Sequence, residues 1–331
     1  IRSVINHRRA HPDDVGANIR RGLDESRKTG TTLSGDIATS GWAWSDYFGA
    51  EFRGVVFQEV LGLSTDRVIQ QKQIGHAHLL DEAHRGITGI SPHAPYSTHL
   101  DLVRDAVRLA NETDCPLAMH LAETRSELEF LADRTGEFRE MLVDFGLWSD
   151  EHGRFGRRPM DYLEIIAGTG RSLVVHGNYL NDEELMFIAA RPQMTLVYCP
   201  RTHAAFGHSS HPWRRAIELG ARVAIGTDSR ASNPNLDLFA ELVFLASISP
   251  DISHLELLRL GSTEGRRALG FGSTGDADFT LVQIGDSSVS PERGLFSTGS
   301  RVCGTMVCGR WKWLAPKFCA ILGESPSDAN G

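Results

Sequence analysis

Four residues that can bind metals or transfer protons stand where apolar segments give way to polar ones. His120 follows the apolar segment 116–119, and Glu123 lies three residues further along the chain. His176 and Asp228 end two other segments of the same kind. If these segments are parallel strands, their carboxyl ends meet on one face of the fold. Imidazole and carboxylate groups gathered there are suited to metal binding and to proton transfer.

His120 and Asp228 supply a nitrogen and an oxygen donor for a shared divalent cation. Zinc in catalytic sites takes about three or four such ligands and keeps a position for water. The metal lowers the pKa of that water to about 7. Glu123 is then placed to take the water proton and pass it to a leaving group, and His176 to hydrogen-bond the hydroxide. One histidine at a strand end is weak support, but several such groups at successive strand ends favour the site.

The segments that would position these residues alternate between strand and helix. We expect strands at residues 31–37, 53–60, 87–90, 116–119, 172–175, 195–198 and 222–225. Short apolar strands separated by helical patterns predict a parallel β/α fold, and in a (β/α)8 barrel the catalytic residues lie at the carboxyl ends of the strands. Since such a barrel has eight strands, we predict an α/β TIM barrel that lacks its first strand. Residues 1–8 have a helical pattern, so we expect that strand upstream of Ile1.

The alternation of strand and helix stops near residue 272. Residues 278–284 and 301–313 alternate apolar and polar side chains around Gly-Asp and Ser-Thr-Gly turns, which predicts a small β-rich unit without helix. We therefore divide the chain into residues 1–271, an incomplete barrel, and residues 272–331, a set of strands and a tail.

The composition narrows the class of protein. The chain has 331 residues, of which 41% are apolar and 23% charged, and this is typical of a folded protein with a large core. No apolar run approaches the ~18 residues of a membrane helix. The net charge is −8 and basic residues are scattered, so we expect neither a nucleic-acid nor a membrane partner. Five widely spaced cysteines favour free thiols and a cytoplasmic location. The oligomeric state stays open, a homo-oligomer included.

Five motifs, in this order, resemble those of the amidohydrolase superfamily, in its branch of adenosine- and S-adenosylhomocysteine-type deaminases and chlorohydrolases. The motifs are SPHAPY from Ser91, HLAET from His120, VHGN from Val175, CPRTH from Cys199 and GTDS from Gly226. The resemblance extends over most of the chain, roughly to Trp313. It implies that the β-rich unit is the C-terminal part of a composite β-sandwich.

The resemblance also implies a role for each matching residue. His120 and Asp228 become metal ligands, and Glu123 becomes the proton shuttle. His176 orients the hydroxide, and Asp228 also accepts the water proton. The residues implied to line the substrate pocket are His93, Arg201 and His203. The family's first strand carries a further His-x-His metal pair, and the chain has no such pair at a predicted strand end.

Two other observations bear on the metal. His76 and His78 have His-x-His spacing, but their surroundings are polar and helical, so we interpret them as a solvated helix face. Some members of the superfamily bridge two metals with a carbamylated lysine. The chain has four lysines, and none follows a predicted strand. We therefore predict one divalent ion, zinc or iron, with zinc favoured.

These residues lead to three hypotheses. The first is a hydrolase that deaminates an aminopurine-like or other small heterocycle through metal-activated hydroxide. The second is a chlorohydrolase or s-triazine hydrolase with the same residues and another leaving group. The third is a non-catalytic fragment or binding protein on the barrel scaffold, which the absent His-x-His pair favours.

Overall fold

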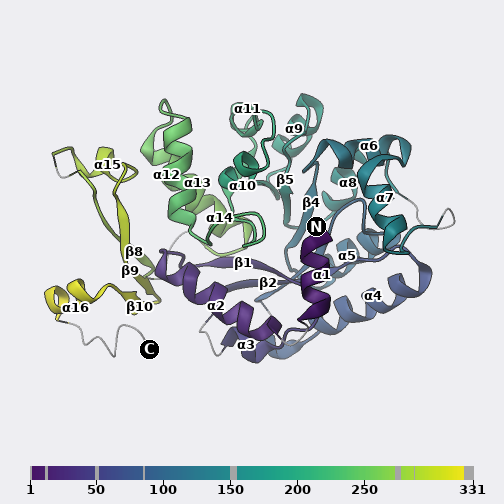
Figure 1. The fold of residues 1–331 in the computed structure, drawn as a ribbon, viewed down its shortest axis with the longest axis horizontal. Helices are drawn as coiled ribbons and strands as arrows, with labels where there is room; N and C mark the ends of the chain where they lie inside the picture. The colour runs from purple at the N-terminus through teal and green to yellow at the C-terminus, as the bar shows by residue number, and fades with distance from the viewer. Residues whose placement is uncertain are drawn as a thin grey trace.

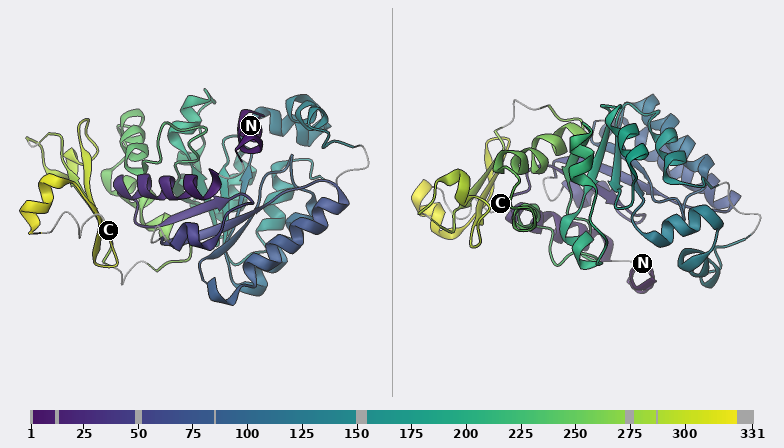
Figure 2. Two further views of the ribbon diagram at one scale, coloured as in Figure 1. Left: turned by 60° about the horizontal axis from the view of Figure 1, so that its bottom comes forward. Right: turned by 90° about the horizontal axis from the view of Figure 1, so that it is seen from above.

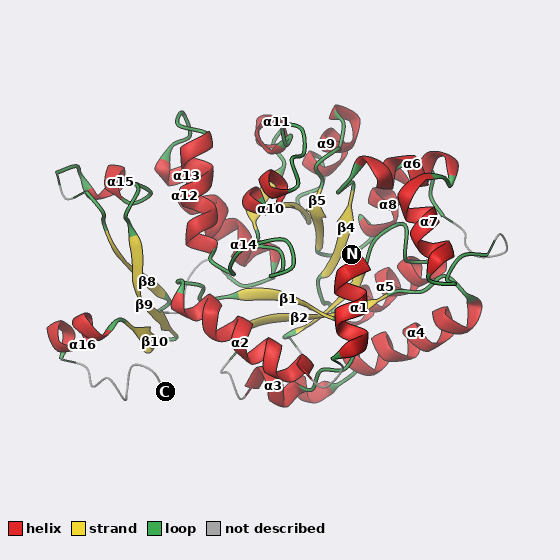
Figure 3. Cartoon of the chain, in the orientation of Figure 1, coloured by secondary structure: helices red, strands yellow, loops and turns green. Residues whose placement is uncertain are grey.

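A computed structural model describes residues 2–11, 14–48, 52–84, 86–149, 155–272, 277–286 and 288–323 (Figure 1). A parallel sheet with helices packed around it forms the larger part, and a second sheet lies near the C-terminus (Figure 3). In the described ranges, no helix has both the length and the apolar character needed to cross a membrane.

The main sheet contains seven parallel strands in the order β1 to β7, so each strand pairs with its neighbour in the chain. The strands are β1 (Ser34–Ala38), β2 (Gly54–Val60), β3 (Thr88–Pro92), β4 (Leu117–Leu121), β5 (Ser172–His176), β6 (Met194–Tyr198) and β7 (Arg222–Ile225). Every predicted strand is present, which confirms the parallel α/β prediction. Among the described residues β1 pairs only with β2 and β7 only with β6, so the sheet is open between them.

Helices precede, connect and follow these strands. They are α1 (Arg2–Ala10), α2 (Val15–Lys28), α3 (Trp44–Phe48), α4 (Thr65–Leu79), the 3-10 turn η2 (Glu82–His84), α5 (Leu100–Thr113), α6 (Arg125–Asp133), α7 (Gly136–Asp144), α8 (Pro159–Ile166), α9 (Asp182–Ala189), α10 (Pro200–Ala205), α11 (Trp213–Glu218), α12 (Leu238–Ile248), α13 (His254–Gly261) and α14 (Thr263–Ala268). Several begin at side-chain caps that the sequence supplies directly. Thr124, Asn181 and Asp237 each accept a hydrogen bond from the backbone N–H three residues later, at the starts of α6, α9 and α12.

Side chains on the inner face of the main sheet show that the sheet is curled. Phe57 of β2 and Leu173 of β5 lie in one buried cluster with Leu269, which directly follows α14. Ile37 of β1 and Val197 of β6 pack against the same cluster. In a flat sheet, with strands about 4.8 Å apart, β1 and β6 would be separated by about 24 Å. The strands therefore curve around this cluster, which brings their carboxyl ends toward one another.

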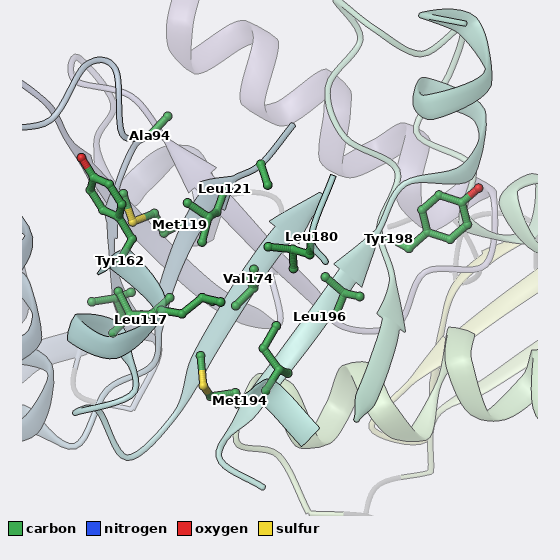
Figure 4. Packing of buried hydrophobic residues seen from close by; sticks show 14 of the residues in the cluster. Ala94, Leu117, Met119, Leu121, Tyr162, Val174, Leu180, Met194, Leu196 and Tyr198 are labelled. Atoms are coloured by element: carbon green, nitrogen blue, oxygen red, sulfur yellow. The ribbon is translucent and has the colours of Figure 1, made fainter. Parts of the chain in front are cut away.

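The alternate side chains of the same strands form the larger core between sheet and helices. Met119 and Leu121 of β4, Val174 of β5 and Leu196 of β6 are fully buried there, and Tyr162 of α8 belongs to the same core, on the side of Met119 (Figure 4). Because both faces of each strand are covered, the strands are apolar along most of their length and lack the strict alternation of a half-exposed sheet.

The second sheet is antiparallel and packs against the start of the chain. Its strands are β8 (Phe279–Gln283), β9 (Arg301–Val307) and β10 (Arg310–Leu314), in the order β10–β9–β8. Thr305 Oγ1 donates a hydrogen bond of 2.6 Å to the carbonyl of Arg27, at the end of α2. The second sheet lies at one end of the molecule (Figure 2). Asp278 pairs with both Arg53 and Arg266, so this sheet is tied to the larger part through buried ion pairs.

The expectation of a C-terminal unit without helix is wrong. Two short helices, α15 (Pro291–Gly294) and α16 (Pro316–Leu322), accompany its strands. Both begin with proline, which fits the first helical position because its missing N–H would have no partner there.

The interpretation of His76 and His78 as a solvated helix face is half right. Both residues lie on α4, as predicted, and His76 is half-buried. His78 is buried, and its Nε2 donates a hydrogen bond of 3.0 Å to the carbonyl of Val56. Burial lowers the pKa of His78 to about 4. This histidine therefore attaches α4 to β2 and is not exposed.

The core predicts a large difference between two leucine truncations. Leu196 is fully buried, whereas Leu255 on α13 is 78% exposed. We expect Leu196→Ala to lower the free energy of unfolding by about 2–5 kcal/mol. Leu255→Ala should change it by less than about 0.5 kcal/mol. Urea titration of both variants tests this, and equal losses would contradict the assigned layers.

Candidate active site

The candidate site lies where β3, β4 and β5 end. His93 follows β3, His120 lies on β4 and His176 is the last residue of β5. The centroid of the His120 ring is 5.2 Å from that of His93 and 5.5 Å from that of His176. Glu123, in the turn after β4, places its Oε1 3.6 Å from Nε2 of His176. The structure thus brings together four of the residues that the sequence singled out.

His120 is held in one tautomer and one orientation. Its Nδ1 donates a hydrogen bond of 2.9 Å to the carbonyl of His93, and its backbone N–H donates to the same oxygen at 3.0 Å. The proton on Nδ1 leaves Nε2 with a lone pair, which is the arrangement of a metal-binding imidazole. Burial lowers the pKa of His120, and the nearby rings of His93 and His176 lower it further, so the ring is kept neutral.

Glu123 is positioned by a second, buried glutamate. Ala122 has φ of 53°, in the left-handed region, so the chain turns sharply between His120 and Glu123. Glu127 is fully buried on α6, and its carboxylate accepts the N–H groups of Ala122 at 2.8 Å and Glu123 at 2.9 Å. Burial raises the pKa of Glu127 to about 8, and the two backbone N–H groups oppose this. Asn178, after β5, donates to the carbonyl of Glu123 at 2.9 Å.

Asp228 stands in a similar turn after β7. Its φ is 58°, and Ser232 Oγ donates to its Oδ2 at 2.5 Å. The charge of this carboxylate acts on the buried thiol of Cys199, the residue before α10. Burial raises the pKa of Cys199 well above its usual value, and the charges of Asp228, Glu241 and Glu123 add to that rise. The placement of Asp228 beside His120 and Glu123 around one cation stays a prediction.

The predicted ligands are of the chemical type found in catalytic metal sites, but there are too few of them. His120 offers an imidazole nitrogen and Asp228 a carboxylate oxygen. Among the described residues there is no group of three or more His, Cys, Asp or Glu arranged to hold a metal ion. Catalytic zinc takes about three protein ligands. Metal binding by His120 and Asp228 therefore stays a prediction.

Comparison with known proteins places this arrangement in a family. Residues 11–311 match the amidohydrolase family. The chain belongs to that family. A 5-methylthioadenosine/S-adenosylhomocysteine deaminase of Pyrococcus furiosus is 31% identical over 193 residues, which make up 56% of this chain and 41% of the relative. The chain spans about 40% of the length of the first curated relatives that it matches.

Solved structures support the same fold. Helicobacter pylori aminofutalosine deaminase in complex with methylthio-coformycin superimposes with a TM-score of 0.80 at 22% identity, covering 93% of this chain and 78% of that one. Zinc-bound atrazine chlorohydrolase TrzN of Arthrobacter aurescens has a TM-score of 0.71 at 18% identity, covering 91% and 72%. The resemblance to the amidohydrolase superfamily is therefore confirmed.

The three residues predicted to line a substrate pocket lie in different settings. His203, on α10, is buried and its Nε2 has no hydrogen-bond partner among the described residues. His93 donates from Nδ1 to Ser97 Oγ at 2.6 Å, which leaves Nε2 facing Glu59 Oε1 at 3.9 Å. Arg201 is in an ion pair with Glu241, its Nε lying 2.7 Å from Oε1. Substrate contact by these three residues stays a prediction.

Sequence reasoning missed several residues that shape the site. Glu59 lies on β2 in register with Ser91, and its position near the end of an apolar strand was an available signal. Glu127 and Glu241 lie inside helices and gave no signal. His211 lies in the loop between α10 and α11. Its Nε2 donates to the carbonyl of His176 at 2.8 Å, and burial lowers its pKa to about 3, so it is a neutral support for that turn.

Loss of the Glu127 carboxylate should destabilise the turn that holds Glu123. In Glu127→Gln one backbone N–H faces an amide group in place of an acceptor, and a buried donor left without an acceptor costs about 1–3 kcal/mol. We expect a decrease of that size in the free energy of unfolding, measured by urea titration. Glu129→Gln, at an exposed position of the same helix, is the matched control. Wild-type stability of Glu127→Gln would contradict the assigned role.

Proposed function

We propose that this amidohydrolase deaminates an aminopurine nucleoside. Water adds to the ring carbon that bears the amino group, the carbon–nitrogen bond breaks, and ammonia leaves. The observation that carries the proposal is the 3.6 Å approach of Glu123 Oε1 to His176 Nε2, beside the neutral ring of His120. The curated relative named as a methylthioadenosine and S-adenosylhomocysteine deaminase supports this substrate class.

The protons in this reaction are moved by carboxylates of the chain. Glu123 takes a proton from the attacking water and delivers it to the ring nitrogen next to the reacting carbon. His176 orients the water through Nε2. Asp228 accepts the second water proton and passes it to the departing amine. Because Glu123 and Asp228 both stand in backbone turns that their neighbours fix, they keep their positions while the proton moves.

A single divalent cation, zinc or iron, completes the proposed chemistry. When bound, it lowers the pKa of a coordinated water toward 7. His120 Nε2 and Asp228 would hold it from this chain. We propose that the main sheet is seven strands of a (β/α)8 barrel, whose eighth would lie between β1 and β7, and that β8–β10 belong to a composite sandwich. Side chains of an eighth strand would face the same mouth, where further ligands are needed.

The substrate would lie across the carboxyl ends of the parallel strands, between His93 and His203. Their Nε2 atoms can each contact a nitrogen or hydroxyl group of a nucleoside. We further propose a cytoplasmic location, which the free thiols of the described cysteines support.

Glu123→Gln should abolish most of the deaminase activity. The amide keeps the shape of the side chain but cannot accept the water proton, and removing a general acid–base group costs about 10²–10⁴-fold in rate. Ammonia release from S-adenosylhomocysteine and methylthioadenosine measures the loss. Glu140→Gln, an exposed change on α7, is the control. Equal turnover in the two variants would contradict the role of Glu123.

The same assay separates the proposal from its rivals. Atrazine in the substrate panel, with chloride as the measured product, tests the chlorohydrolase hypothesis. Chloride release without ammonia release would replace the deaminase proposal. Release of neither product by zinc-loaded protein that includes the proposed eighth strand would favour a binding protein.

His120→Asn should reduce the zinc that the chain retains. The amide is a poorer zinc ligand than the imidazole and cannot reproduce its position on β4. We expect at least a tenfold weaker zinc affinity, measured by competition with a chromogenic chelator. His76→Asn, on α4, is the control histidine variant. A zinc affinity that falls equally in both variants would place the metal elsewhere.

A further inference from the structure

The turn that carries Asp228 is connected to the buried ion pair of Arg201 and Glu241. Neither residue takes part in the reaction steps proposed above. Glu241 lies on α12 with its side chain fully buried. Its carboxylate accepts three hydrogen bonds, from the backbone N–H of Arg201 at 2.9 Å, from Nε of Arg201 at 2.7 Å and from Nδ2 of Asn233 at 2.6 Å. The carboxylate thus joins the end of β6 to the loop after β7.

Asn233 connects Glu241 to the backbone beside Asp228. Its Nδ2 also donates to the carbonyl of Thr227 at 2.6 Å. That carbonyl belongs to the peptide group between Thr227 and Asp228, and the orientation of this peptide sets φ of Asp228. A left-handed φ in a residue other than glycine is unfavourable, so the turn needs such a contact to persist.

The far end of the loop is held by the same arginine. One terminal nitrogen of Arg201 donates to Oδ1 of Asn235 at 2.6 Å and to its carbonyl at 3.2 Å. Between the two ends, the N–H groups of Ser232 and Asn233 both donate to the carbonyl of Ser229. Ser232 also contacts the Asp228 carboxylate. The ion pair therefore fixes the loop at both sides of the residue that holds the carboxylate in place.

A purely stabilising role accounts poorly for this arrangement. Burying a charged pair costs desolvation energy that apolar side chains would avoid, so such a pair is weak support for stability alone. The guanidinium of Arg201 is also planar and makes its contacts in a fixed fork, which a flexible cation would not do. Its Nε and one terminal nitrogen are hydrogen-bonded to Glu241 and Asn235.

We propose that Arg201, Glu241 and Asn233 are positioning residues for Asp228, and that they act on the affinity of the site for its cation. The second part rests on the function proposed above. The first part concerns the loop alone and can be tested without any metal.

Amide hydrogen exchange of the full chain tests the first part. In Glu241→Gln the carboxamide keeps the size of the side chain but loses the charge that holds Arg201. We expect exchange at Ser232 and Asn233 to become at least tenfold faster than in the wild type. The matched control is Glu264→Gln. Glu264 is a buried glutamate on α14 that pairs with Arg222 at the amino end of β7, away from Asp228.

The two exchange profiles decide the positioning role. Faster exchange of the Asp228 loop in Glu241→Gln alone supports it. Unchanged exchange in Glu241→Gln, or an equal increase in both variants, overturns it. If Glu241→Gln does not fold, Arg201→Lys takes its place, because lysine keeps the charge but cannot reproduce the forked contacts. The same tenfold criterion then applies.

Zinc affinity, measured by chelator competition, tests the second part. Residues that orient a metal ligand typically contribute about 10–100-fold to metal affinity. We expect a loss in that range for Glu241→Gln and none for Glu264→Gln. Wild-type zinc affinity in Glu241→Gln overturns the effect on the cation. If protein that includes the proposed eighth strand binds no zinc, the proposed metal-dependent function is overturned, while the exchange data still decide the positioning role.

Discussion

The hydrogen bond from His120 Nδ1 to the carbonyl of His93 fixes the centre of this site. It joins the carboxyl ends of β3 and β4, and it leaves Nε2 of His120 as the nitrogen with a lone pair. The same carbonyl accepts the backbone N–H of His120, so the ring is oriented by an atom that also takes part in strand pairing. The rings of His93 and His176 are placed around this one. The site therefore depends on the curl of the sheet as much as on its own side chains.

Three residues of the candidate site and its turns stand on backbone that is locally unfavourable. Ala122, His176 and Asp228 all have φ between 53° and 71°, and for residues with a Cβ this conformation costs roughly 1–2 kcal/mol each. In every case a buried polar group holds the turn. Glu127 accepts the N–H of Ala122, His211 donates to the carbonyl of His176, and the ion-pair network described above supports Asp228. The strain thus reorients side chains at strand ends, and packed helices behind the sheet maintain it.

The sequence allowed prediction of those features that depend on residues close together in the chain. A short apolar segment that ends in a polar residue marks a strand end, so the seven strands and His120 were found. His78 and Arg201 were judged by their immediate neighbours, but their partners Val56 and Glu241 lie 22 and 40 residues away. Burial of a polar side chain is decided by such distant partners, and a single sequence gives no pattern for them. For the same reason, the sequence did not reveal that Glu127 and Glu241, which lie inside helices, support the turns at Ala122 and Asp228.

The charges around the mouth bear on the cation that the family chemistry requires. Burial raises the pKa of Tyr96 well above its usual value, and the negative charges of Glu123, Glu127 and Glu59 raise it further. Burial keeps the ring of His120 neutral, so it does not offset these carboxylates. The nearby arginine of the loop is already paired with its own glutamate. Carboxylates gathered in a partly buried site favour a divalent cation over an anion. If the proposed cation binds, these residues would strengthen its binding without touching it.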